Sequence, residues 1–558
     1  MGDHVAASST ARSGGVTDRL RAVFGGRPSA PVTPRILGDR AVVAGGSIAG
    51  TLAARVLSDW YREVVVVDRD EVLGVTGMRK GASHAVHAHG LHARGYLILS
   101  DLFPGLLDDA KELGLPVRDF GLMRWYFNAR PIARTETGLL SVAGNRPVLE
   151  NYLRSRVAGL PNVTYRQHTD VLGLVATGDR GRVTGIRIQE RTPGSPEERL
   201  DADLVVDATG RGSRLPVWLT ELGYERPVEE RMTIGLAYTT RTYRRRPGTF
   251  DGPVAINPVA SPEHPRGAFF GQTATGDFRL SLTGILGDHP PTDPTGFEEY
   301  VRTLPVADIH QAVRDADPTG DAVSFTFPAS VWRHYERLSR FPAGLAVLGD
   351  AVCSFNPVYG QGMTAAAMQV TALRRFLDRQ PAADGRSYLR DVARLMRHPW
   401  QLSTRTDLDF PGVGPRSLPI RLHNAYLVRL QYAMTKDPEV TRAYMRVAGL
   451  VDPPRTLWRL PLLVRVLRLA RDMPATSPVP PPAPAPAPGL SPAPVLSAAP
   501  DSSPKPVLSP PSGGPSMPVP SPAAAPVPST GAASTPPSAP SATGVEDGPV
   551  DAGQRSGS

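Results

Sequence analysis

A glycine-rich turn between two apolar runs constrains the fold of this chain more than any other feature. The turn, Gly45–Gly50, follows the apolar run Ala41–Ala44 and leads into a stretch rich in alanine and leucine. A second apolar run, Val64–Val67, then ends in Asp68. Strand, glycine turn, helix, strand and acid, in this order, make the βαβ unit that binds dinucleotides.

Each special residue of this unit has a physical task. Gly45 permits a tight turn, Ser47 is small enough for the backbone to approach a pyrophosphate, and Gly50 allows close helix–strand packing. The helix N-terminus offers free N–H groups to the phosphates. Asp68 stands where a carboxylate accepts a hydrogen bond from a ribose hydroxyl. A turn that serves only helix–strand packing is the alternative interpretation.

A second segment narrows the choice of nucleotide to FAD. The apolar run 344–349 ends in Asp350, and a loop that contains Gly360 and Gly362 leads into a predicted helix over 365–377. Asp350 can accept a ribityl hydroxyl, and the two glycines leave room beside an isoalloxazine ring. The positive end of the following helix would stabilise negative charge on a reduced flavin. An ordinary strand–loop–helix connection is the alternative.

A third segment completes a pattern that resembles a known family. Asp203–Leu215 is another buried strand with a glycine-rich exit, whose part Asp207–Leu215 carries the resemblance, and Arg79–Gly81 is followed by His87–His89. With Asn356–Met363, these segments resemble the FAD-dependent aromatic-hydroxylase-like monooxygenases, in the branch of bacterial polyether epoxidases and related polyketide-tailoring enzymes. The resemblance covers residues from about 38 to about 470.

The resemblance implies which residues hold the cofactor. Arg146 matches a helix residue that faces the flavin, Val171 matches the backbone contact to adenine, and Asp350 matches the ribityl ligand. The predicted FAD-binding residues are Gly45, Ser47, Gly50, Asp68, Arg69, Arg79, Lys80, Arg146, Val171, Gly349, Asp350, Pro357, Gly360, Gly362 and Met363.

The resemblance also implies the reaction. Reduced FAD reacts with O2, and the resulting flavin C4a-hydroperoxide transfers one oxygen atom to an electron-rich carbon. We expect a hydrophobic, polyketide-type secondary metabolite as substrate and epoxidation of an alkene as the reaction. Aromatic hydroxylation and FAD-dependent reduction or dehydrogenation of a prenyl or polyketide alkene are the alternatives. A halogenase is disfavoured because no Trp-x-Trp-x-Ile motif occurs, and the sequence names no catalytic side chain.

Two departures from the family pattern concern the electron donor and the flavin surroundings. Relatives that bind NAD(P)H directly carry Asp-Gly where this chain has Thr209-Gly210, so NAD(P)H acts either directly or through a separate flavin reductase. The related branch also places an arginine before His-Ala-His, where this chain has Ser83–Val86. A basic contact near the flavin is therefore missing or comes from elsewhere.

The predicted fold class is α/β, with a Rossmann-like FAD-binding domain, an inserted mixed β-sheet substrate domain and a C-terminal helical region. Both ends have too little apolar surface to offset the entropy of ordering, so we expect them to be disordered. A non-enzymatic alternative is a redox sensor whose proline-rich tail recruits a partner. The predicted parts are an arm (1–35), the FAD-binding domain (36–224 and 339–380), the substrate sheet (225–338), the helical region (381–473) and a Pro/Ala/Ser-rich tail (474–558).

The middle of the chain alternates apolar and polar residues with a period of two. Phe278–Thr283 and Val323–Phe327 show this pattern, which predicts strands with one covered face. In the resembling family such a sheet lies over the flavin ring. The side chains predicted to line a hydrophobic substrate cavity are Leu236, Tyr238, Phe269 and Phe325, with packing into the core as the alternative.

Charge and composition limit the partners of the chain. The net charge is +9, but the arginines are scattered and form no basic stripe with interleaved aromatics, so nucleic acid is not an expected partner. The expected partners are a hydrophobic small molecule, free or bound to a carrier protein, and a flavin reductase. Cys353 is the single cysteine, which excludes a disulfide within the chain and fits a cytoplasmic location.

Two further patterns raise the question of a membrane contact and of a metal site. No apolar run reaches the roughly 18 residues of a membrane span, and the basic amphipathic stretch Leu457–Leu469 is expected to cap a domain with its arginines outward rather than to contact a membrane. Four neighbouring histidines suggest a metal, but their spacing fits no standard site and no cysteine joins them, so we expect none. These histidines are His84, His87, His89 and His92.

Overall fold

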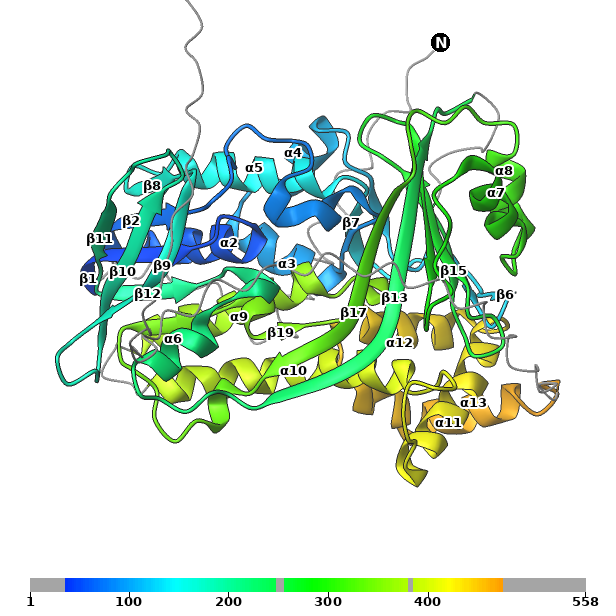
Figure 1. Cartoon of the computed structure of the whole chain (residues 1–558). Helices are drawn as coiled ribbons and strands as arrows, with labels where there is room; N and C mark the ends of the chain where they lie inside the picture. Colours follow the sequence, from blue (N-terminus) through cyan, green and yellow to red (C-terminus); the bar gives the residue numbers. More distant parts are fainter. Residues whose placement is uncertain (1–35, 247–254, 380–384, 475–558) are drawn as a thin grey trace, which may run out of the picture. The chain divides into compact units, whose positions relative to one another are not determined.

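The computed structural model describes residues 36–246, 255–379 and 385–474 (Figure 1). The predicted arm (1–35) and all but the first residue of the predicted tail (474–558) lie outside the described residues. The described chain is of the α/β class that the sequence predicts, with a parallel sheet, a large mixed sheet and surrounding helices.

A five-stranded parallel sheet forms the first layer. Its centre is fully buried because valines and alanines fill both faces, as expected for a parallel sheet that helices cover on each side. The carboxyl ends of its strands lie at one edge, where loops from distant parts of the chain meet. In spatial order the strands are β18 Leu345–Val347, β12 Leu204–Asp207, β1 Gly38–Ala44, β2 Tyr61–Val67 and β8 Val163–Arg166.

Helices connect and cover these strands. The helix α2, Ile48–Leu57, joins β1 to β2 and packs against both α5 and α9. The predicted helix over 365–377 is confirmed as α9, which begins three residues earlier. The other helices of this part are α3 Ala93–Leu102, α4 Leu106–Glu112, α5 Arg146–Ala158, α6 Leu215–Glu221 and α9 Gly362–Asp378.

An eight-stranded sheet forms the second large element and contains both predicted alternating strands. Figure 1 shows its long strands β13 and β17 side by side, and α7 (Pro294–Arg302) with α8 (Ala307–Val313) on one side of the sheet. The strand order is β19 Cys353–Ser354, β17 Val323–Arg333, β13 Glu229–Tyr243, β16 Phe278–Gly284, β15 Gly267–Gln272, β14 Ala255–Val259, β5 Arg124–Phe127 and β6 Arg130–Pro131.

This sheet contains two strands from outside the predicted substrate segment (225–338). The strands β5 and β6 belong to the stretch 36–224, and β5 pairs in parallel with β14 through Trp125 and Asn257. The two parts of the chain are therefore interleaved, and the exact boundaries between domains stay a prediction. Two small antiparallel sheets complete the strands: β3 Gly90–Leu91, β7 Leu140–Ala143 and β4 Val117–Asp119; and β11 Glu197–Asp201, β10 Val183–Glu190 and β9 Thr169–Ala176.

The end of the described chain is helical. Its buried apolar side chains, such as Leu430 and Met445, pack with Phe120 and Phe127 in one hydrophobic cluster. None of the helices within the described residues is both long and apolar enough to span a membrane. The elements are α10 Gly385–Asp407, α11 Leu418–Met434, α12 Pro438–Ala448, α13 Leu460–Leu469 and the short 3₁₀ helix η6 Pro454–Trp458.

Candidate functional site

The glycine turn after β1 forms a cradle that only glycine can build. Gly45 has a φ of +102°, and a Cβ added there would lie 2.5 Å from the carbonyl oxygen of Ala208. A Cβ on Gly50 would lie 1.7 Å from the carbonyl oxygen of Gly45. The turn therefore brings the N-terminus of α2 close to β1, where its free N–H groups face a ligand.

Asp68 follows β2 at the same edge of the sheet. Its Oδ2 accepts a hydrogen bond of 2.6 Å from the backbone N–H of Gly46, and its Oδ1 accepts one of 2.9 Å from the N–H of Asp70. These bonds fix the carboxylate beside the glycine turn. A carboxylate has lone pairs to spare, so Asp68 can still accept a ribose hydroxyl.

Arg79 is a buried cation inside this cradle. Its Nη2 donates a hydrogen bond of 2.6 Å to Oγ of Ser47, and its Nη1 lies 3.5 Å from Oδ2 of Asp70 and 3.9 Å from Oδ1 of Asp68. The residue is only 8% exposed. The structure thus brings the predicted residues Ser47, Asp68 and Arg79 together around the N-terminus of α2, where pyrophosphate charge would be neutralised.

Glu150 on α5 ties three arginines to this region, and sequence reasoning missed it. Its Oε1 accepts a bond of 2.8 Å from Arg146, and its Oε2 lies 2.9 Å from Arg154 and 3.4 Å from Arg79. Burial alone would raise the pKa of Glu150, but the three guanidinium groups outweigh it and lower the pKa to about 2. The carboxylate is therefore charged at every working pH. The only sequence signal was its place one helical turn after Arg146.

Arg146 lies beside two histidines of the segment 83–89. Its Nη1 lies 2.7 Å from Nε2 of His84 and 3.3 Å from Nε2 of His89. Arginine has no acceptor, so it donates to these nitrogens, which must be unprotonated. Burial, with the charge of Arg146, lowers the pKa of His84 to about 3 and that of His89 well below its ordinary value. The two imidazoles are neutral positioning groups.

Asp350 follows β18 within the short helix η4, Gly349–Ala351. Its side chain forms no hydrogen bond with any part of the chain that the structure describes, although the residue is half-buried. Burial raises the pKa of its carboxyl, and the charges of Arg146, Arg211 and Arg333 offset this only in part. A half-buried carboxylate with free acceptor positions beside the cradle fits a ligand hydroxyl.

We expect Asp350→Ala to weaken FAD binding by about 5- to 150-fold. The lost hydrogen bond to a charged acceptor is worth roughly 1–3 kcal/mol, and about 1.4 kcal/mol is a factor of ten in Kd. Titration of the apoprotein with FAD, followed by flavin fluorescence, measures the change. Asp315→Ala, which changes an exposed aspartate in the turn after α8, is the matched control. An unchanged Kd in Asp350→Ala would remove this residue from the site.

The loop 356–362 is the third part of the site. Gly360 has a φ of +64°, and a Cβ there would lie 2.8 Å from Nε2 of His92. Gly362 begins α9, and a Cβ there would meet nothing within 4 Å. The backbone therefore has open space at the first turn of α9, as a flat ring beside the loop requires. Pro357 begins the loop's 3₁₀ turn, and Met363 is buried beneath it.

The remaining predicted cofactor residues lie around the cradle. Gly349 has a φ of +66° and adjoins Asp350, and its N–H donates to Oε1 of Gln369. Val171 lies on β9, half-buried against the main core. Arg69 and Lys80 are exposed, and neither side chain forms a hydrogen bond or an ion pair with the described residues, so their assignment stays a prediction.

Asp407, the last residue of α10, binds the loop through two of its side chains, and no sequence motif marks it. Its Oδ1 accepts hydrogen bonds from Nδ2 of Asn356 (2.9 Å) and from the hydroxyl of Tyr359 (2.8 Å). The residue is 0% exposed, and its Oδ2 has no partner within the described chain. Burial raises the pKa of Asp407 to about 6, and the two donors lower it only in part.

We expect Asp407→Asn to flatten the pH dependence of stability. The folded state binds a proton between about pH 4 and pH 6 that the unfolded state releases, so the contribution of Asp407 to stability is present below about pH 4 and is lost as pH rises through 6. The variant keeps the Oδ1 acceptor but cannot titrate. Urea unfolding at pH 4.5 and pH 8 should show a gain over wild type at pH 8 on the order of 2–3 kcal/mol. Equal pH slopes would refute the shifted pKa.

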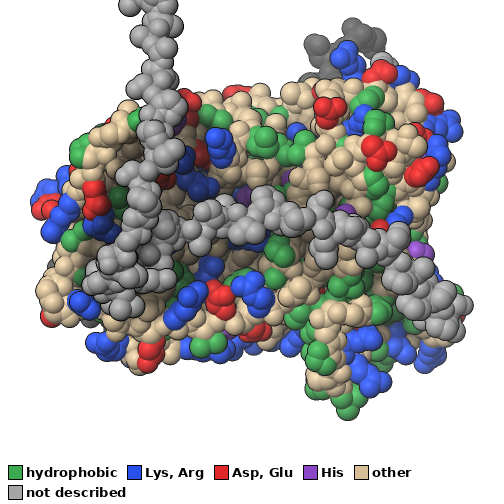
Figure 2. Space-filling model, in the orientation of Figure 1, with side chains coloured by type: hydrophobic (Ala, Val, Ile, Leu, Met, Phe, Trp, Pro, Cys, Tyr) green, Lys and Arg blue, Asp and Glu red, His purple; other side chains and the backbone are tan. Residues whose placement is uncertain are grey.

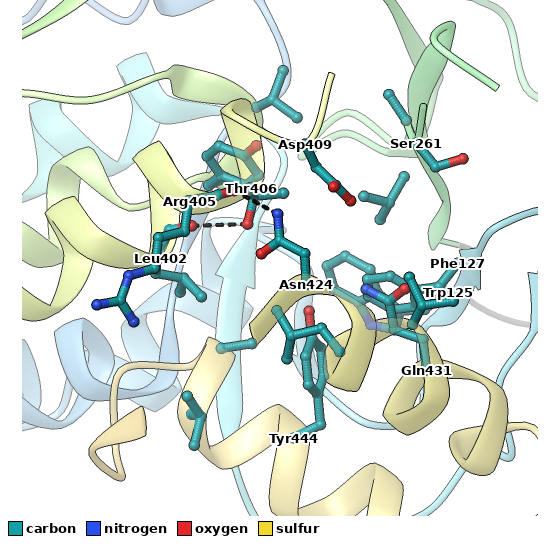
Figure 3. Close-up of a pocket in the computed structure, with 18 of the residues that line it drawn as sticks. Trp125, Phe127, Ser261, Leu402, Arg405, Thr406, Asp409, Asn424, Gln431 and Tyr444 are labelled. Atoms are coloured by element: carbon teal, nitrogen blue, oxygen red, sulfur yellow. Dashed lines mark hydrogen bonds between the residues drawn. The ribbon is translucent and has the colours of Figure 1, made fainter. Parts of the chain in front are cut away.

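Two adjoining cavities lie next to the loop. The smaller, of about 90 Å³, is lined by Tyr238, Phe269 and the loop residues 357–360. The larger, of about 150 Å³, lies between the loop and the helices α10, α11 and α12 (Figure 3). Tyr359 and Trp125 line both cavities. A long ligand could therefore extend from the loop into the helical region.

The four predicted cavity residues divide into two pairs. Tyr238 and Phe269 line the smaller cavity, and the Tyr238 hydroxyl is buried without a partner in the described chain. Leu236 and Phe325 line neither cavity, so this part of the prediction is corrected. Leu236 is buried in a cluster that includes Phe410, and the ring of Phe325 lies against that of His84 with centroids 5.6 Å apart. The covered sheet face extends beyond the cavity, so apolar side chains farther along it become core.

The larger cavity combines aromatic walls with polar atoms that lack partners. Trp125, Phe127 and Tyr444 form much of its wall (Figure 3). The side-chain oxygens Oγ of Ser261, Oε1 of Gln361 and Oδ1 of Asn424 are buried without a hydrogen bond in the described chain. Buried polar atoms are costly unless a ligand or water pairs with them. The cavity suits a mostly apolar molecule that carries a few oxygen groups.

The family of this chain is shown by comparison with known proteins. Residues 40–399 match the family model described as FAD binding domain, so the chain belongs to that family. The prediction of an FAD-dependent enzyme of the monooxygenase class, made from the sequence motifs, is confirmed at this level. The matched range contains the glycine turn, Asp350 and the loop 356–362.

A curated relative and two solved structures are similar to this chain. Protein Rv3254 of Mycobacterium tuberculosis (strain ATCC 25618 / H37Rv) is 34% identical over 451 residues, which cover 77% of this chain and 93% of the relative. The flavin-dependent brominase Bmp2 superposes with a TM-score of 0.55 at 14% identity, covering 77% of this chain and 98% of the brominase. A flavoprotein/dehydrogenase from Cytophaga hutchinsonii gives a TM-score of 0.54 at 14% identity, with the same coverage of the two chains. These two structures show a shared fold.

The residues of this site fit FAD. The cradle at α2 with Arg79 suits a pyrophosphate, Asp68 a ribose, Asp350 a ribityl chain and the open space at Gly362 a flat ring. No group of three histidine, cysteine or acidic side chains that could hold a metal occurs within the described residues. The four histidines instead bond to neighbours, as in the contact of Nδ1 of His87 with the Thr240 hydroxyl at 2.7 Å.

Proposed function

We propose that this enzyme transfers one oxygen atom from O2 to an alkene of an elongated, mostly apolar, polyketide-type molecule and so forms an epoxide. The observation that carries the proposal is the pair of adjoining cavities, which begin at the loop 357–360 and continue between aromatic walls into the helical region. The smaller cavity receives the reacting carbons, and the larger one receives the rest of the molecule. The sequence resemblance to polyether epoxidases supports the same substrate class.

Bound FAD, once reduced, supplies the activation of O2. The side chains of this protein have three tasks around it. The cradle and Asp350 hold the cofactor, while Tyr238 and Phe269 confine the substrate beside the loop. The apolar walls exclude water, which protects a reactive oxygen species from loss. Holding the target carbons in one geometry reduces the entropic part of the barrier.

The reaction needs two electrons and two protons, which reduce the second oxygen atom to water. We propose NAD(P)H as their source, through a separate flavin reductase. The support is Thr209, which stands where relatives that bind NAD(P)H carry aspartate. Its hydroxyl donates a bond of 2.6 Å to Oδ1 of the buried Asp207, so it serves the end of β12 rather than a nucleotide.

The test uses the holoenzyme with ¹⁸O2 and a panel of polyene and aromatic polyketide substrates, once with NADPH alone and once with NADPH and a flavin reductase. Mass spectrometry of the products should show one ¹⁸O atom and an intact carbon skeleton in an epoxide. A phenolic product would favour the aromatic hydroxylase alternative. A saturated or desaturated product without ¹⁸O would move the assignment to a reductase or dehydrogenase and would refute oxygen transfer.

A further inference from the structure

The helix α13 is apolar on two faces, and only one of them is covered. Val466 is fully buried against the helical core, with Leu462 and Leu463 beside it. On another face Leu460, Val464 and Leu467 are 70%, 56% and 48% exposed. Their spacing of i, i+4 and i+7 places them in one stripe along the helix. The sequence predicted a capping helix with arginines outward, but this helix also presents leucine and valine outward.

The neighbouring helix α11 extends this apolar surface. Leu418 and Leu422 are 63% and 61% exposed, and Trp458 at the end of η6 is 41% exposed. The two helices run side by side, because the Tyr426 hydroxyl donates 2.6 Å to the carbonyl of Leu457 at one end and Lys436 pairs with Asp472 at the other. Figure 2 shows hydrophobic side chains gathered over α11 and α13 with basic side chains beside them. We name Leu418, Leu422, Trp458, Leu460, Val464 and Leu467 the α11/α13 face.

The charges around this face are unbalanced. Each carboxylate of the segment 418–472 already has a basic partner: Asp437 with Arg465, Glu439 with Arg442, Asp452 with Arg446 and Asp472 with Lys436. Six exposed arginines of the same segment form no ion pair within the described chain, so the segment that carries the apolar face also carries uncompensated positive charge. One of them is Arg429, which bonds only to a backbone carbonyl. The other five are Arg421, Arg455, Arg459, Arg468 and Arg471.

We propose that the α11/α13 face docks on an anionic lipid surface. Exposed aliphatic side chains with a tryptophan at their border and exposed arginines in the same segment are the composition of an interfacial helix pair, which lies on a bilayer without spanning it. The apolar stripe enters the headgroup boundary, and the arginines pair with anionic headgroups. Charge complementarity thus selects an acidic membrane rather than a neutral one.

The position of the face indicates what membrane docking would do for the enzyme, an inference that rests on the proposed function. Leu457, Pro454 and His423 line the larger cavity, and Trp458 stacks on His423 with ring centroids 5.7 Å apart. The docked face therefore adjoins one wall of the cavity. A hydrophobic substrate dissolved in the bilayer could reach the cavity without crossing water, whose exclusion of apolar molecules makes them scarce in solution.

The test is sedimentation of the FAD-loaded full chain with phosphatidylcholine vesicles that contain one-quarter phosphatidylglycerol, and with pure phosphatidylcholine vesicles. We expect binding to the anionic vesicles at least tenfold tighter than to the neutral ones, and weaker binding at high salt. The double variant Leu460→Asp/Val464→Asp should lose at least tenfold. Val228→Asp, an equally exposed apolar residue on another part of the chain, should bind as wild type does.

Two control measurements test whether the double variant is still folded and loaded with FAD. FAD content and melting temperature must be equal in wild type and the double variant, since both changed residues are exposed. Binding to anionic vesicles that is absent, or equal in the double variant and wild type, overturns the proposal; so does binding of a purified acidic carrier protein to this face without vesicle binding. Vesicle binding requires no turnover, so failure here is distinct from failure of the ¹⁸O2 experiment.

Discussion

Gly50→Ala should abolish FAD binding and destabilise the fold by at least about 3 kcal/mol. A methyl group at residue 50 would lie 1.7 Å from the carbonyl oxygen of Gly45, which is far inside any contact distance. That oxygen belongs to the backbone, so no side chain can move aside, and the whole turn must open. The N-terminus of α2 would then leave the phosphate position. The ratio of FAD to protein in the purified variant and its melting temperature measure both effects.

Gly77→Ala is the matched control for this variant. A Cβ at residue 77 meets nothing within 4 Å, and its φ lies outside the left-handed region, so the change should leave FAD content unaltered and stability the same or slightly higher. If Gly50→Ala retained full FAD content, the turn after β1 would not hold the phosphates, and the assignment of the cradle would have to be abandoned.

The cradle could be predicted because its signals are local. Gly45, Gly50 and Asp68 lie within one βαβ unit, and the tight turn demands glycine whatever surrounds it. Asp350 could be predicted for a related reason. It follows another buried strand, and the carboxyl ends of parallel strands meet at one edge of the sheet, as the pairing of β1, β2, β12 and β18 shows.

The buried carboxylates that support the site could not be predicted, because they bind partners that lie far away in the sequence. Glu150 meets Arg79 across 71 residues, and Asp407 meets Tyr359 across 48. Nothing near Asp407 marks it as the partner of a loop; its role exists only once α10 packs behind that loop. Buried charges of this kind depend on the whole fold, whereas glycine turns depend on a few neighbouring backbone atoms.

Of the four residues predicted to line a cavity, Tyr238 and Phe269 do so and Leu236 and Phe325 do not, and the reason is geometric. Alternation along β13 places Leu236 and Tyr238 on the same covered face, but it does not say where the cover ends. In the structure Leu236 and Tyr238 belong to one buried cluster with Phe410, and only Tyr238 also lines the smaller cavity. Much of the larger cavity comes from α10, α11 and α12, whose packing no local pattern reveals.

Glu150→Gln should cost about 3–5 kcal/mol of stability at neutral pH and weaken FAD binding. Glu150 is 3% exposed and is the shared counter-ion of Arg79, Arg146 and Arg154, so its neutralisation leaves buried positive charge without compensation. Because the fold lowers its pKa to about 2, its contribution is fully present above about pH 4.5 and is lost as pH falls toward 2. Urea unfolding at pH 7 and pH 3, with FAD titration, measures both effects.

Glu197→Gln offers the same chemical change in a solvent-exposed ion pair. Glu197 and Arg187 are each 45% exposed and lie 2.9 Å apart, so solvent screens the pair and the variant should lose less than about 1 kcal/mol. The difference between the two glutamines therefore isolates burial as the cause. If both variants lost the same small amount, the three arginines would not depend on Glu150, and the electrostatic link between α5 and the cradle would be wrong. If only Glu150→Gln lost stability but kept its FAD affinity, α5 would support the fold without positioning the cofactor.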